Sequence, residues 1–429
     1  MNNNNANNAN GLSADCAGLH PQWWGERSKE IYLTEPSAFT DPGSYVPVPN
    51  TAKQTPETGL SCEILSLSVP VTRASMKTYE EIISYDCLKD GLRKSCKGVM
   101  WKDSVANYRL NAVKNTWKLR QDLLNGIYQI QAYHVFHIAE PKVREIVATR
   151  LRDRQFQRSL CDNYLYEAVT KGFIHDNCAC QIGKGVSFAH KRMGVHLRRY
   201  FNKHGKDGWV LQCDIAKFFP STPHETAKKA IRKRVKDDAI YQHIENIIDS
   251  FGGDHGIGLG SQASQLIELA ILDDLDHFIK ERLRIKHYIR YMDDFILIHQ
   301  DRSVLENALQ EIRGRVEALG LKLNHKTHIF TLKQGIKFLR WRYLLTDSGK
   351  IVRRMDRRSI IRERRKIKKF GAKIGRGEIP ERKLTESYSS WCAHAKQGNT
   401  NSIIRNMNVL YCETLQRARK ELQNEQNCF

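Results

Sequence analysis

Two adjacent carboxylates, Asp293 and Asp294, interrupt a stretch of β-branched and aromatic residues. The flanking segments 288–290 and 295–298 predict two short strands joined by a tight turn, which would lift both acids off a buried sheet into solvent. Carboxylate oxygens are ligands for Mg²⁺, which usually keeps several of its waters. Because Asp is also a common turn residue, the pair alone fits an ordinary turn equally well.

A third carboxylate, Asp214, ends a second apolar run that begins at Trp209. The chain between Asp214 and Asp293 is long enough for a helical crossover that brings the two strands side by side. Two strands of one sheet that each offer an Asp make a site for two metal ions about 3.5–4 Å apart, which suits in-line phosphoryl transfer. The alternative is that Asp214 caps a helix near Pro223, but the buried strand before it favours a functional acid.

In this setting the chain resembles the reverse transcriptases. Five motifs occur in the order of that family, at 214–219, 256–265, 291–294, 319–327 and 337–341, and segment 136–146 resembles the hairpin of the fingers subdomain. Each motif is weak alone, but the ordered set is specific. The similarity spans residues 130–345, approximately half of the chain.

The resemblance implies an α+β fold, a right-hand polymerase with fingers, a ferredoxin-like palm and a helical thumb. We expect an Asn-rich and irregular N-terminal extension of unknown role over residues 1–75, and fingers over 76–205. A palm with the catalytic carboxylates would cover 206–335, and a basic helical thumb would cover 336–429. The first ten residues include seven Asn and no apolar core, which does not fit a signal peptide.

Helical periodicity occurs on both sides of the palm. Apolar residues at Leu110, Val113, Trp117 and Leu124 predict helices over residues 79–128. Similar spacing after residue 350 predicts helices with an apolar core in the thumb. The residues expected in that core are Ile360, Ile367, Phe370, Ile374, Tyr388, Trp391 and Tyr411.

The resemblance implies a role for each acid. Asp214 and Asp293 would bind two Mg²⁺ ions together with Ile215, and Asp294 would support that site electrostatically. Lys326 matches a lysine that protonates the departing pyrophosphate, although a single Lys in a basic protein is more often a surface charge.

The nucleotide would contact several further residues. Lys142 and Arg144 are candidates for binding the triphosphate of the incoming deoxynucleotide (dNTP), since cations stabilise a transferring phosphoryl group. Phe219 would place its ring against the sugar and exclude a 2′-hydroxyl, and Gly260 and Gln265 belong to the block near the nucleotide. The alternatives are an ordinary solvated hairpin for the cations and a core position for Phe218 or Phe219.

Two positions depart from the common pattern of the family. Leu259 stands where most relatives have Gln, and the block ends in Ser264-Gln265 rather than in Pro. This form resembles the enzymes of diversity-generating retroelements, in which the apolar residue is associated with relaxed base choice opposite adenine; the alternative is that Leu259 only packs in the palm. Arg340 replaces a common Gly, which puts the geometry of the primer-gripping hairpin in doubt.

The charge of the chain indicates a polyanionic partner. Lys and Arg number 69 against 47 Asp and Glu, a net charge of +22. Segment 350–376 contains thirteen basic residues and two acids. Its position after the palm favours binding of a nucleic-acid duplex over an ordinary solvated face. The residues expected to contact nucleic acid are Tyr291, Met292, Arg353, Arg354, Arg357, Arg358, Arg364, Arg365, Lys368 and Lys369.

Neither a membrane-spanning helix nor a zinc site is expected. The sequence has no apolar run of 18 residues, the length that a membrane-spanning helix needs. Cys178 and Cys180 lack the spacing of a zinc-binding pair, and no second pair follows at a plausible distance. Eleven cysteines without a secretion signal fit a reducing cytosol, so we expect a cytoplasmic protein.

These observations predict an RNA-directed DNA polymerase that copies a structured RNA template into cDNA with two Mg²⁺ ions and dNTPs, and that binds the RNA–DNA duplex. A diversity-generating retroelement is the first biological interpretation. An antiphage reverse transcriptase that copies a dedicated non-coding RNA is the alternative. A non-catalytic RNA-binding scaffold and a maturase are less favoured, and an accessory protein or a second copy of the chain is left open as a partner.

Overall fold

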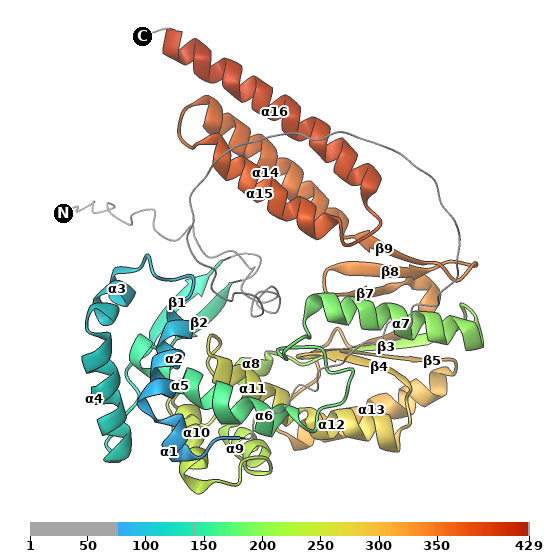
Figure 1. Ribbon diagram of the computed structural model, residues 1–429. Coiled ribbons are helices and arrows are strands. Elements are labelled where there is room, and N and C mark those ends of the chain that lie inside the picture. Colours follow the sequence, from blue (N-terminus) through green and yellow to red (C-terminus); the bar gives the residue numbers. More distant parts are fainter. Residues whose placement is uncertain (1–75, 140–142, 428–429) are drawn as a thin grey trace, which may run out of the picture. The chain divides into compact units, whose positions relative to one another are not determined.

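Figure 1 shows the computed structural model of the protein, which describes residues 76–139 and 143–427. All helices and strands named here belong to the unit Lys77–Phe429. Lys142 lies outside the described residues. No helix in the described ranges is long and apolar enough to cross a membrane.

The predicted helices over residues 79–128 and the predicted hairpin are confirmed. The helices are α1 (Tyr79–Ile82), α2 (Tyr85–Cys96), α3 (Asp103–Leu110) and α4 (Ala112–Leu124). Strands β1 (His134–Ile138) and β2 (Arg144–Ala148) pair antiparallel. Thr78 begins α1 with a capping box, in which its side chain and that of Glu81 accept from each other's backbone N–H.

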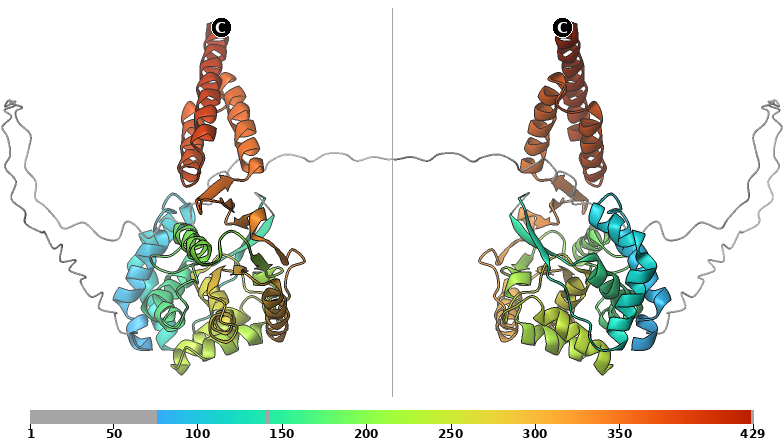
Figure 2. Two further views of the ribbon diagram at one scale, coloured as in Figure 1. Left: turned by 90° about the vertical axis from the view of Figure 1, so that its right-hand side faces the viewer. Right: turned by 90° about the vertical axis from the view of Figure 1, so that its left-hand side faces the viewer.

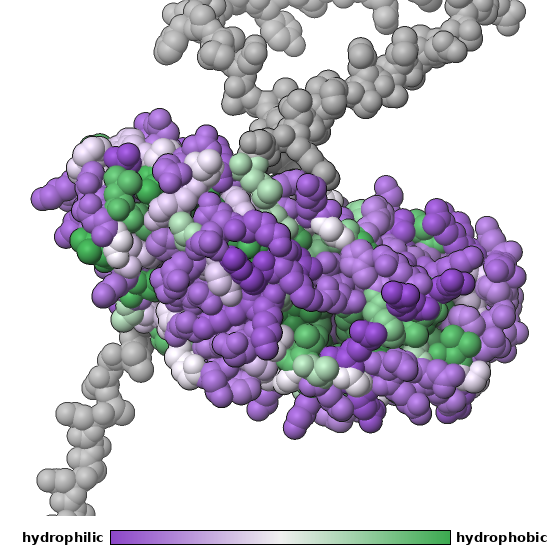
Figure 3. All heavy atoms as spheres, turned by 90° about the horizontal axis from the view of Figure 1, so that it is seen from below, coloured by the Kyte–Doolittle hydropathy of each residue, from purple (hydrophilic) through white to green (hydrophobic). Residues whose placement is uncertain are grey.

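The apolar residues that predicted α3 and α4 do not form a core. Leu110, Val113, Trp117 and Leu124 are all exposed, and the buried face of α4 consists of Thr116, Leu119 and Leu123 instead. The 3.6-residue period therefore identified the helix correctly, but it did not identify the face that packs. Seen from below, the molecule is mostly polar with separate apolar patches on its surface (Figure 3).

A set of helices connects the hairpin to the palm. They are α5 (Leu151–Leu160), a π-helical turn (Cys161–Leu165), α6 (Tyr166–Thr170) and the long α7 (Val186–His204). Helix α2 packs along α5, where Gly91 allows close approach because a Cβ there would lie 2.5 Å from the carbonyl oxygen of Gln155. Helix α7 lies over one face of the palm sheet and contacts β4 (Figure 1).

The palm is a four-stranded antiparallel sheet with the order β4-β5-β3-β6. Its strands are β3 (Trp209–Asp214), β4 (His287–Tyr291), β5 (Asp294–His299) and β6 (His328–Thr331). The crossover from β3 to β4 contains α8 (Phe218–Ser221), α9 (His224–Arg232), α10 (Asp238–Asp249), α11 (Gln262–Ile271), α12 (Asp273–His277) and a π-helical turn (Phe278–Arg282). Helix α13 (Arg302–Ala318) connects β5 to β6, which completes the β-α-β-β-α-β order of a ferredoxin-like palm.

Both faces of this sheet are buried, which explains why its strands read as continuous apolar runs. Leu211 and Cys213 face a core shared with α13, whereas Val210, Ile296 and Ile298 face a second core shared with α7. Successive side chains of a strand point to opposite faces, so each strand contributes to both cores.

The segment predicted as the thumb, residues 336–429, begins with a second sheet and continues with helices. That sheet consists of β7 (Ile336–Phe338), β8 (Trp341–Leu345) and β9 (Ile351–Met355) in sequential antiparallel order, after a 3₁₀ turn (Leu332–Gln334). Helices α14 (Arg357–Gly375), α15 (Glu381–Ala395) and α16 (Asn401–Asn427) then pack together (Figure 2). Gly371 permits the contact of α14 with α16, because a Cβ there would lie 2.1 Å from the side chain of Thr414.

The predicted thumb core is confirmed. Ile367 and Ile374 are fully buried, and Ile360 and Phe370 pack against the same cluster. The ring of Tyr388 stacks on Trp391 and on Tyr411, with centroid distances of 5.9 and 4.5 Å. Together the hairpin, palm and thumb give the α+β, right-hand polymerase fold that the sequence predicted.

Candidate active site

The three acids meet at one end of the central palm strands. Asp214 is the last residue of β3 and Asp294 the first residue of β5, and the two are register partners. Tyr291 pairs with Asp294, so Met292 and Asp293 form a two-residue turn between β4 and β5. Met292 adopts a left-handed conformation with φ of 55°. The prediction that neighbouring strands bring these acids together is confirmed.

The expectation that the turn lifts both acids into open solvent is wrong. Asp294 belongs to β5 rather than to the turn, and the side chains of both Asp293 and Asp294 are partly buried. The cause is that the turn is only two residues long and Met292 packs into an apolar cluster with Ala179 and Leu269.

Burial and mutual repulsion raise the pKa of these carboxyls. Burial, followed by the charge of Asp214, raises the pKa of Asp293 to about 6. Burial raises the pKa of Asp294 to about 7, with further contributions from the charges of Asp293 and Asp214. Each acid therefore lies within electrostatic reach of the others, and a cation among them would relieve the repulsion.

The acids fit a divalent metal by their chemistry rather than as a preassembled cluster. In the described part of the chain, no three His, Cys, Asp or Glu side chains are grouped closely enough to form a ready-made metal site. The three mutually repelling carboxylates nevertheless offer the hard oxygen ligands that Mg²⁺ takes, and Mg²⁺ is commonly bound through only one or two carboxylates with waters and substrate phosphates.

Two amides that the sequence analysis did not assign hold the acids in place. The side-chain amide of Asn324 donates to Asp214 Oδ2 at 2.7 Å, and its backbone N–H donates to the Asp214 carbonyl at 2.7 Å. Gln212 Nε2 donates to Asp294 Oδ1 at 3.3 Å. Two signals in the sequence could have indicated these amides. Asn324 lies within the recognised motif 319–327, and Gln212 lies two positions before Asp214, on the same face of the strand.

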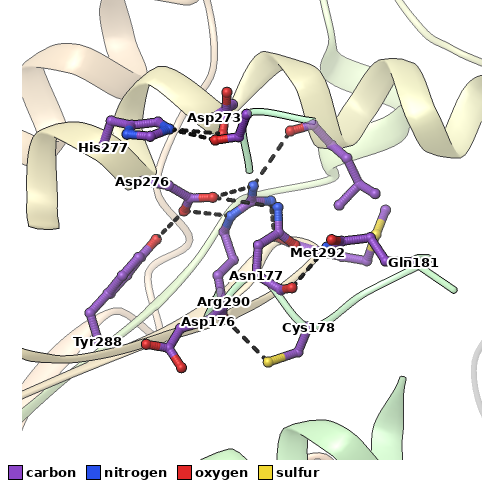
Figure 4. Close-up of polar contacts among 12 residues, drawn as sticks. Asp176, Asn177, Cys178, Gln181, Asp273, Asp276, His277, Tyr288, Arg290 and Met292 are labelled. Atoms are coloured by element: carbon purple, nitrogen blue, oxygen red, sulfur yellow. Dashed lines mark hydrogen bonds and ion pairs between the residues drawn. The ribbon is translucent and has the colours of Figure 1, made fainter. Parts of the chain in front are cut away.

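A fully buried ion pair lies behind the turn (Figure 4). Arg290 Nε and Nη2 donate to the two carboxylate oxygens of Asp276 at 2.7 and 2.6 Å, and Tyr288 Oη donates to Asp276 Oδ1 at 2.5 Å. Arg290 Nη1 donates to the Met292 carbonyl at 3.0 Å, and Nη2 donates to the Leu269 carbonyl at 3.4 Å. Arg290 thus holds the backbone of the turn that bears Asp293.

The fingers hairpin rests on the block that contains Leu259. The Val147 N–H donates to the Leu259 carbonyl at 3.0 Å, and a Cβ on Gly260 would lie 2.9 Å from the Val147 carbonyl oxygen. Gly260 is therefore required for this close approach. Arg144 at the start of β2 is exposed, and its charge lowers the pKa of Asp293, so this cation lies within electrostatic reach of the acids.

The structure distinguishes the two phenylalanines after Asp214. Phe218 is 3% exposed and belongs to the palm core. Phe219 is only partly buried and packs against the cluster of Ala179, Leu269 and Met292, beside the acidic turn. Its carbonyl accepts from the Ile257 N–H at 2.9 Å.

The remaining predicted palm residues lie around this centre. Ile215 is buried and bridges to Leu323, next to Asn324. Lys326 is exposed in the turn before β6, and Gln265 is partly buried on α11. Tyr291 is partly buried at the end of β4.

The hairpin that is expected to grip the primer has a strained turn. Leu339 and Arg340 connect β7 to β8 with φ of 47° and 71°, and Phe338 pairs with Trp341 on either side. Such angles favour Gly, so Arg340 takes a conformation that Gly adopts at a lower cost. The hairpin therefore forms despite this substitution.

The basic residues after the palm lie on two elements. Arg353 and Arg354 are in β9 rather than in a helix, and the Arg353 N–H donates to Asn399 Oδ1 at 2.8 Å. The others lie on α14 with exposed side chains, and within the described residues none of them forms an ion pair. They are Arg357, Arg358, Arg364, Arg365, Lys368 and Lys369.

Comparison with known proteins agrees with this geometry. Residues 141–343 match the family model described as reverse transcriptase (RNA-dependent DNA polymerase). Protein YkfC of Escherichia coli (strain K12) is 24% identical over a segment that covers 52% of this chain and 69% of YkfC.

Two solved telomerase structures are also similar to this chain. They are telomerase of Candida albicans in complex with a fragment of telomeric RNA and apo telomerase of Candida tropicalis without its C-terminal domain, each 12% identical, with TM-scores of 0.39 and 0.41. The matches cover 62% and 57% of this chain, and 55% and 60% of those chains. The match over residues 141–343 contains strand β2 of the hairpin, all three acids and strand β7, so this part of the chain is similar to the reverse transcriptase family.

Proposed function

We propose that the protein is an RNA-directed DNA polymerase that extends a 3′-hydroxyl with deoxynucleotides on an RNA template. The observation that supports this most strongly is the convergence of Asp214, Asp293 and Asp294 inside a reverse transcriptase domain. In this proposal the fingers cover residues 76–205, the palm 206–335 and the thumb 336–429.

Asp214 and Asp293 would hold two Mg²⁺ ions together with the carbonyl of Ile215, and the charge of Asp294 would support the site. When bound, the ions lower the pKa of the attacking hydroxyl and stabilise the leaving oxygen. Asn324 fixes Oδ2 of Asp214 by donating to it, and so orients the carboxylate before metal arrives.

The substrate would lie between the hairpin and the acids. Arg144 and Lys142 would bind the triphosphate, and Lys326 would donate a proton to pyrophosphate. The ring of Phe219 would exclude a ribose 2′-hydroxyl. Gly260 and Gln265 would contact the nucleotide from below.

The nucleic acid would extend from the palm to the thumb. Tyr291 and Met292 would contact the primer end, and the cations Arg353 and Arg354 of β9 with the exposed cations of α14 would bind the phosphates of the RNA–DNA duplex. A primer-extension assay tests the activity: the purified protein should extend a DNA primer on an RNA template with dNTPs. A protein that binds the RNA and adds no nucleotide under any primer arrangement would instead be a scaffold.

We further propose that the enzyme serves a diversity-generating retroelement. Leu259 has no polar side-chain group, so it supplies no hydrogen bond that would link correct base pairing to catalysis. We therefore predict that wild-type cDNA contains misincorporations enriched opposite template adenine, and that Leu259→Gln lowers their rate about tenfold to a hundredfold, the equivalent of 1–3 kcal/mol.

Deep sequencing of cDNA made on a defined RNA template measures this rate. Leu283→Gln, at a partly buried leucine that packs against the palm core, controls for a general effect of the substitution. A low and uniform error rate that Leu259→Gln leaves unchanged would favour the alternative, a defence enzyme that copies a dedicated RNA faithfully. The polymerase assignment would stand in either case.

A further inference from the structure

A buried acid next to the proposed active site has no role so far. Glu268 lies on α11 with its side chain fully buried, and its Oε1 has no hydrogen-bond partner among the described residues. Its Oε2 lies 3.1 Å from the hydroxyl oxygen of Thr222, which is also fully buried. Burying a carboxyl with one unsatisfied oxygen is costly, so its position calls for an explanation.

The contacts of Thr222 indicate which group is the donor. Its hydroxyl oxygen lies 2.9 Å from the Phe218 carbonyl, which can only accept, and 3.1 Å from Glu268. A hydroxyl has a single hydrogen. If it donates to Phe218, Glu268 must carry a proton and donate to Thr222. Burial and the charge of Asp293 raise the pKa of Glu268 to about 8, which agrees with an uncharged acid at neutral pH.

This chain of hydrogen bonds ends on the turn that holds Phe219. Helix α8 is a single turn, entered through Lys217 in a left-handed conformation with φ of 48°, so its own backbone fixes it weakly. The Glu268–Thr222–Phe218 chain fixes the turn on one side, and the bond from the Ile257 N–H to the Phe219 carbonyl fixes it on the other.

Leu269, the residue after Glu268 on α11, lies beside the ring of Phe219. Leu269 forms a cluster with Met292 and Ala179, against which Phe219 packs, and its carbonyl accepts from Arg290. Helix α11 therefore fixes both the backbone and the ring of Phe219 relative to the acidic turn.

We propose that Glu268 is a positioning residue that, through its contact with Thr222, fixes the turn of Phe219 and thereby determines the choice between deoxynucleotides and ribonucleotides. The inference rests on the proposed polymerase function, with Phe219 against the sugar. If the ring of Phe219 moved by a fraction of its thickness, it would leave room for the 2′-hydroxyl of a ribonucleotide. Loss of Glu268 should therefore weaken sugar selection more than it weakens dNTP incorporation.

The test compares kcat/KM for a dNTP with that for the matching ribonucleotide. We expect Glu268→Leu and Thr222→Val each to lower this ratio at least about tenfold, and Phe219→Ala to lower it further. Glu268→Gln should restore most of the selection, since its amide also donates to Thr222. Adding Glu268→Leu to Phe219→Ala should lower the ratio no further, because residues that act through one contact are not additive.

A buried acid elsewhere provides the matched control. Glu363 on α14 is also buried, its Oε1 has no hydrogen-bond partner in the part of the chain that the structure describes, and Glu363→Leu should leave the ratio unchanged. Thr222→Val keeps the side-chain volume and tests the same contact if Glu268→Leu does not fold.

The outcomes separate this inference from the proposed function. If Phe219→Ala lowers the ratio while Glu268→Leu and Thr222→Val do not, the positioning role is wrong and the polymerase assignment stands. If Glu268→Gln behaves like Glu268→Leu, an uncharged donor is not what the turn needs, and the inference is wrong. An unchanged ratio in Phe219→Ala also overturns it, because another residue then selects the sugar. A wild-type protein that adds no nucleotide removes the proposed function itself.

Discussion

In the palm, Arg290 and Asp276 are fully buried and form an ion pair. The acids Asp293 and Asp294 are partly buried, and Arg290 binds the backbone of the turn that bears Asp293. On helix α14 of the thumb, cations such as Arg364 and Lys368 are exposed and form no ion pair with any described residue. Buried charges depend on their geometry and are little screened, whereas exposed charges act through their number and are screened by salt. The palm is therefore suited to chemistry that requires fixed positions, and the thumb to binding a uniform phosphate backbone.

The largest effect on stability is expected at the buried pair. Arg290→Met leaves Asp276 buried without its partner and should cost about 3–5 kcal/mol in the free energy of unfolding. Replacing both residues, as Arg290→Met with Asp276→Leu, should recover most of that loss. Nucleotide addition should remain impaired, because the Met292 carbonyl has lost its donor. Urea unfolding and single-nucleotide addition measure the two effects.

Tyr288→Phe is the matched control, since it removes one hydrogen bond to Asp276 and leaves the contact of Arg290 with Met292. It should cost about 1 kcal/mol and leave synthesis largely intact. Full synthesis by the double variant would show that the pair contributes only to packing.

A smaller effect on stability is expected from Asp294, the acid at the start of β5. Its pKa in the folded protein, about 7, lies above the ordinary value of 3.8, so its ionisation opposes folding. Without divalent cations, the wild-type protein should therefore lose stability as pH rises from about 4 through 7. Asp294→Asn should show a smaller loss, because Asp293 still ionises with a raised pKa, and should be more stable at pH 8 by about 1 kcal/mol or more.

Thermal unfolding between pH 4 and pH 8 in EDTA measures this difference. Glu311→Gln, at an exposed acid of α13, serves as the control. Parallel pH profiles for wild-type protein and Asp294→Asn would mean that the carboxyl is not destabilised by its surroundings.

The smallest effect is expected in the thumb. Arg365→Gln with Lys369→Gln should weaken binding of an RNA–DNA duplex and reduce the slope of log affinity against log salt by about 1.8, because two phosphate contacts are lost. The rate at saturating duplex should not change. Lys89→Gln with Lys97→Gln, at exposed positions near α2, removes the same charge elsewhere and should leave the slope unchanged. Equal slopes for the two pairs would assign the effect to net charge alone.

The sequence predicted what depends on local pattern. The strands around Asp293, the helix of Ile367 and Ile374, and the fold class followed from periodicity and ordered motifs. The partners of the acids could not be predicted in this way. Asn324 is 110 positions from Asp214, and no local rule connects residues that far apart in the chain.

The buried and exposed faces of helices were also difficult to predict. Trp117 and Leu124 have the spacing of a core stripe, yet they are exposed, since packing depends on which neighbouring helix is present. The exact environment of the acids depended likewise on the length of one turn, which made them partly buried rather than exposed.

The most direct test of the account is RNA-templated addition of a single dNTP by wild-type protein and by Asp293→Ala with Asp294→Ala, measured over a range of Mg²⁺ concentrations. Because the substitutions remove the ligand Asp293 and the supporting charge of Asp294 and leave the thumb unchanged, we predict a loss of at least about 1,000-fold in the rate, with RNA affinity within about twofold of wild type. Wild-type addition should require Mg²⁺ and stop in EDTA. Substantial synthesis by the double variant, or wild-type synthesis in EDTA, would contradict the assignment of these acids as the metal-dependent active site.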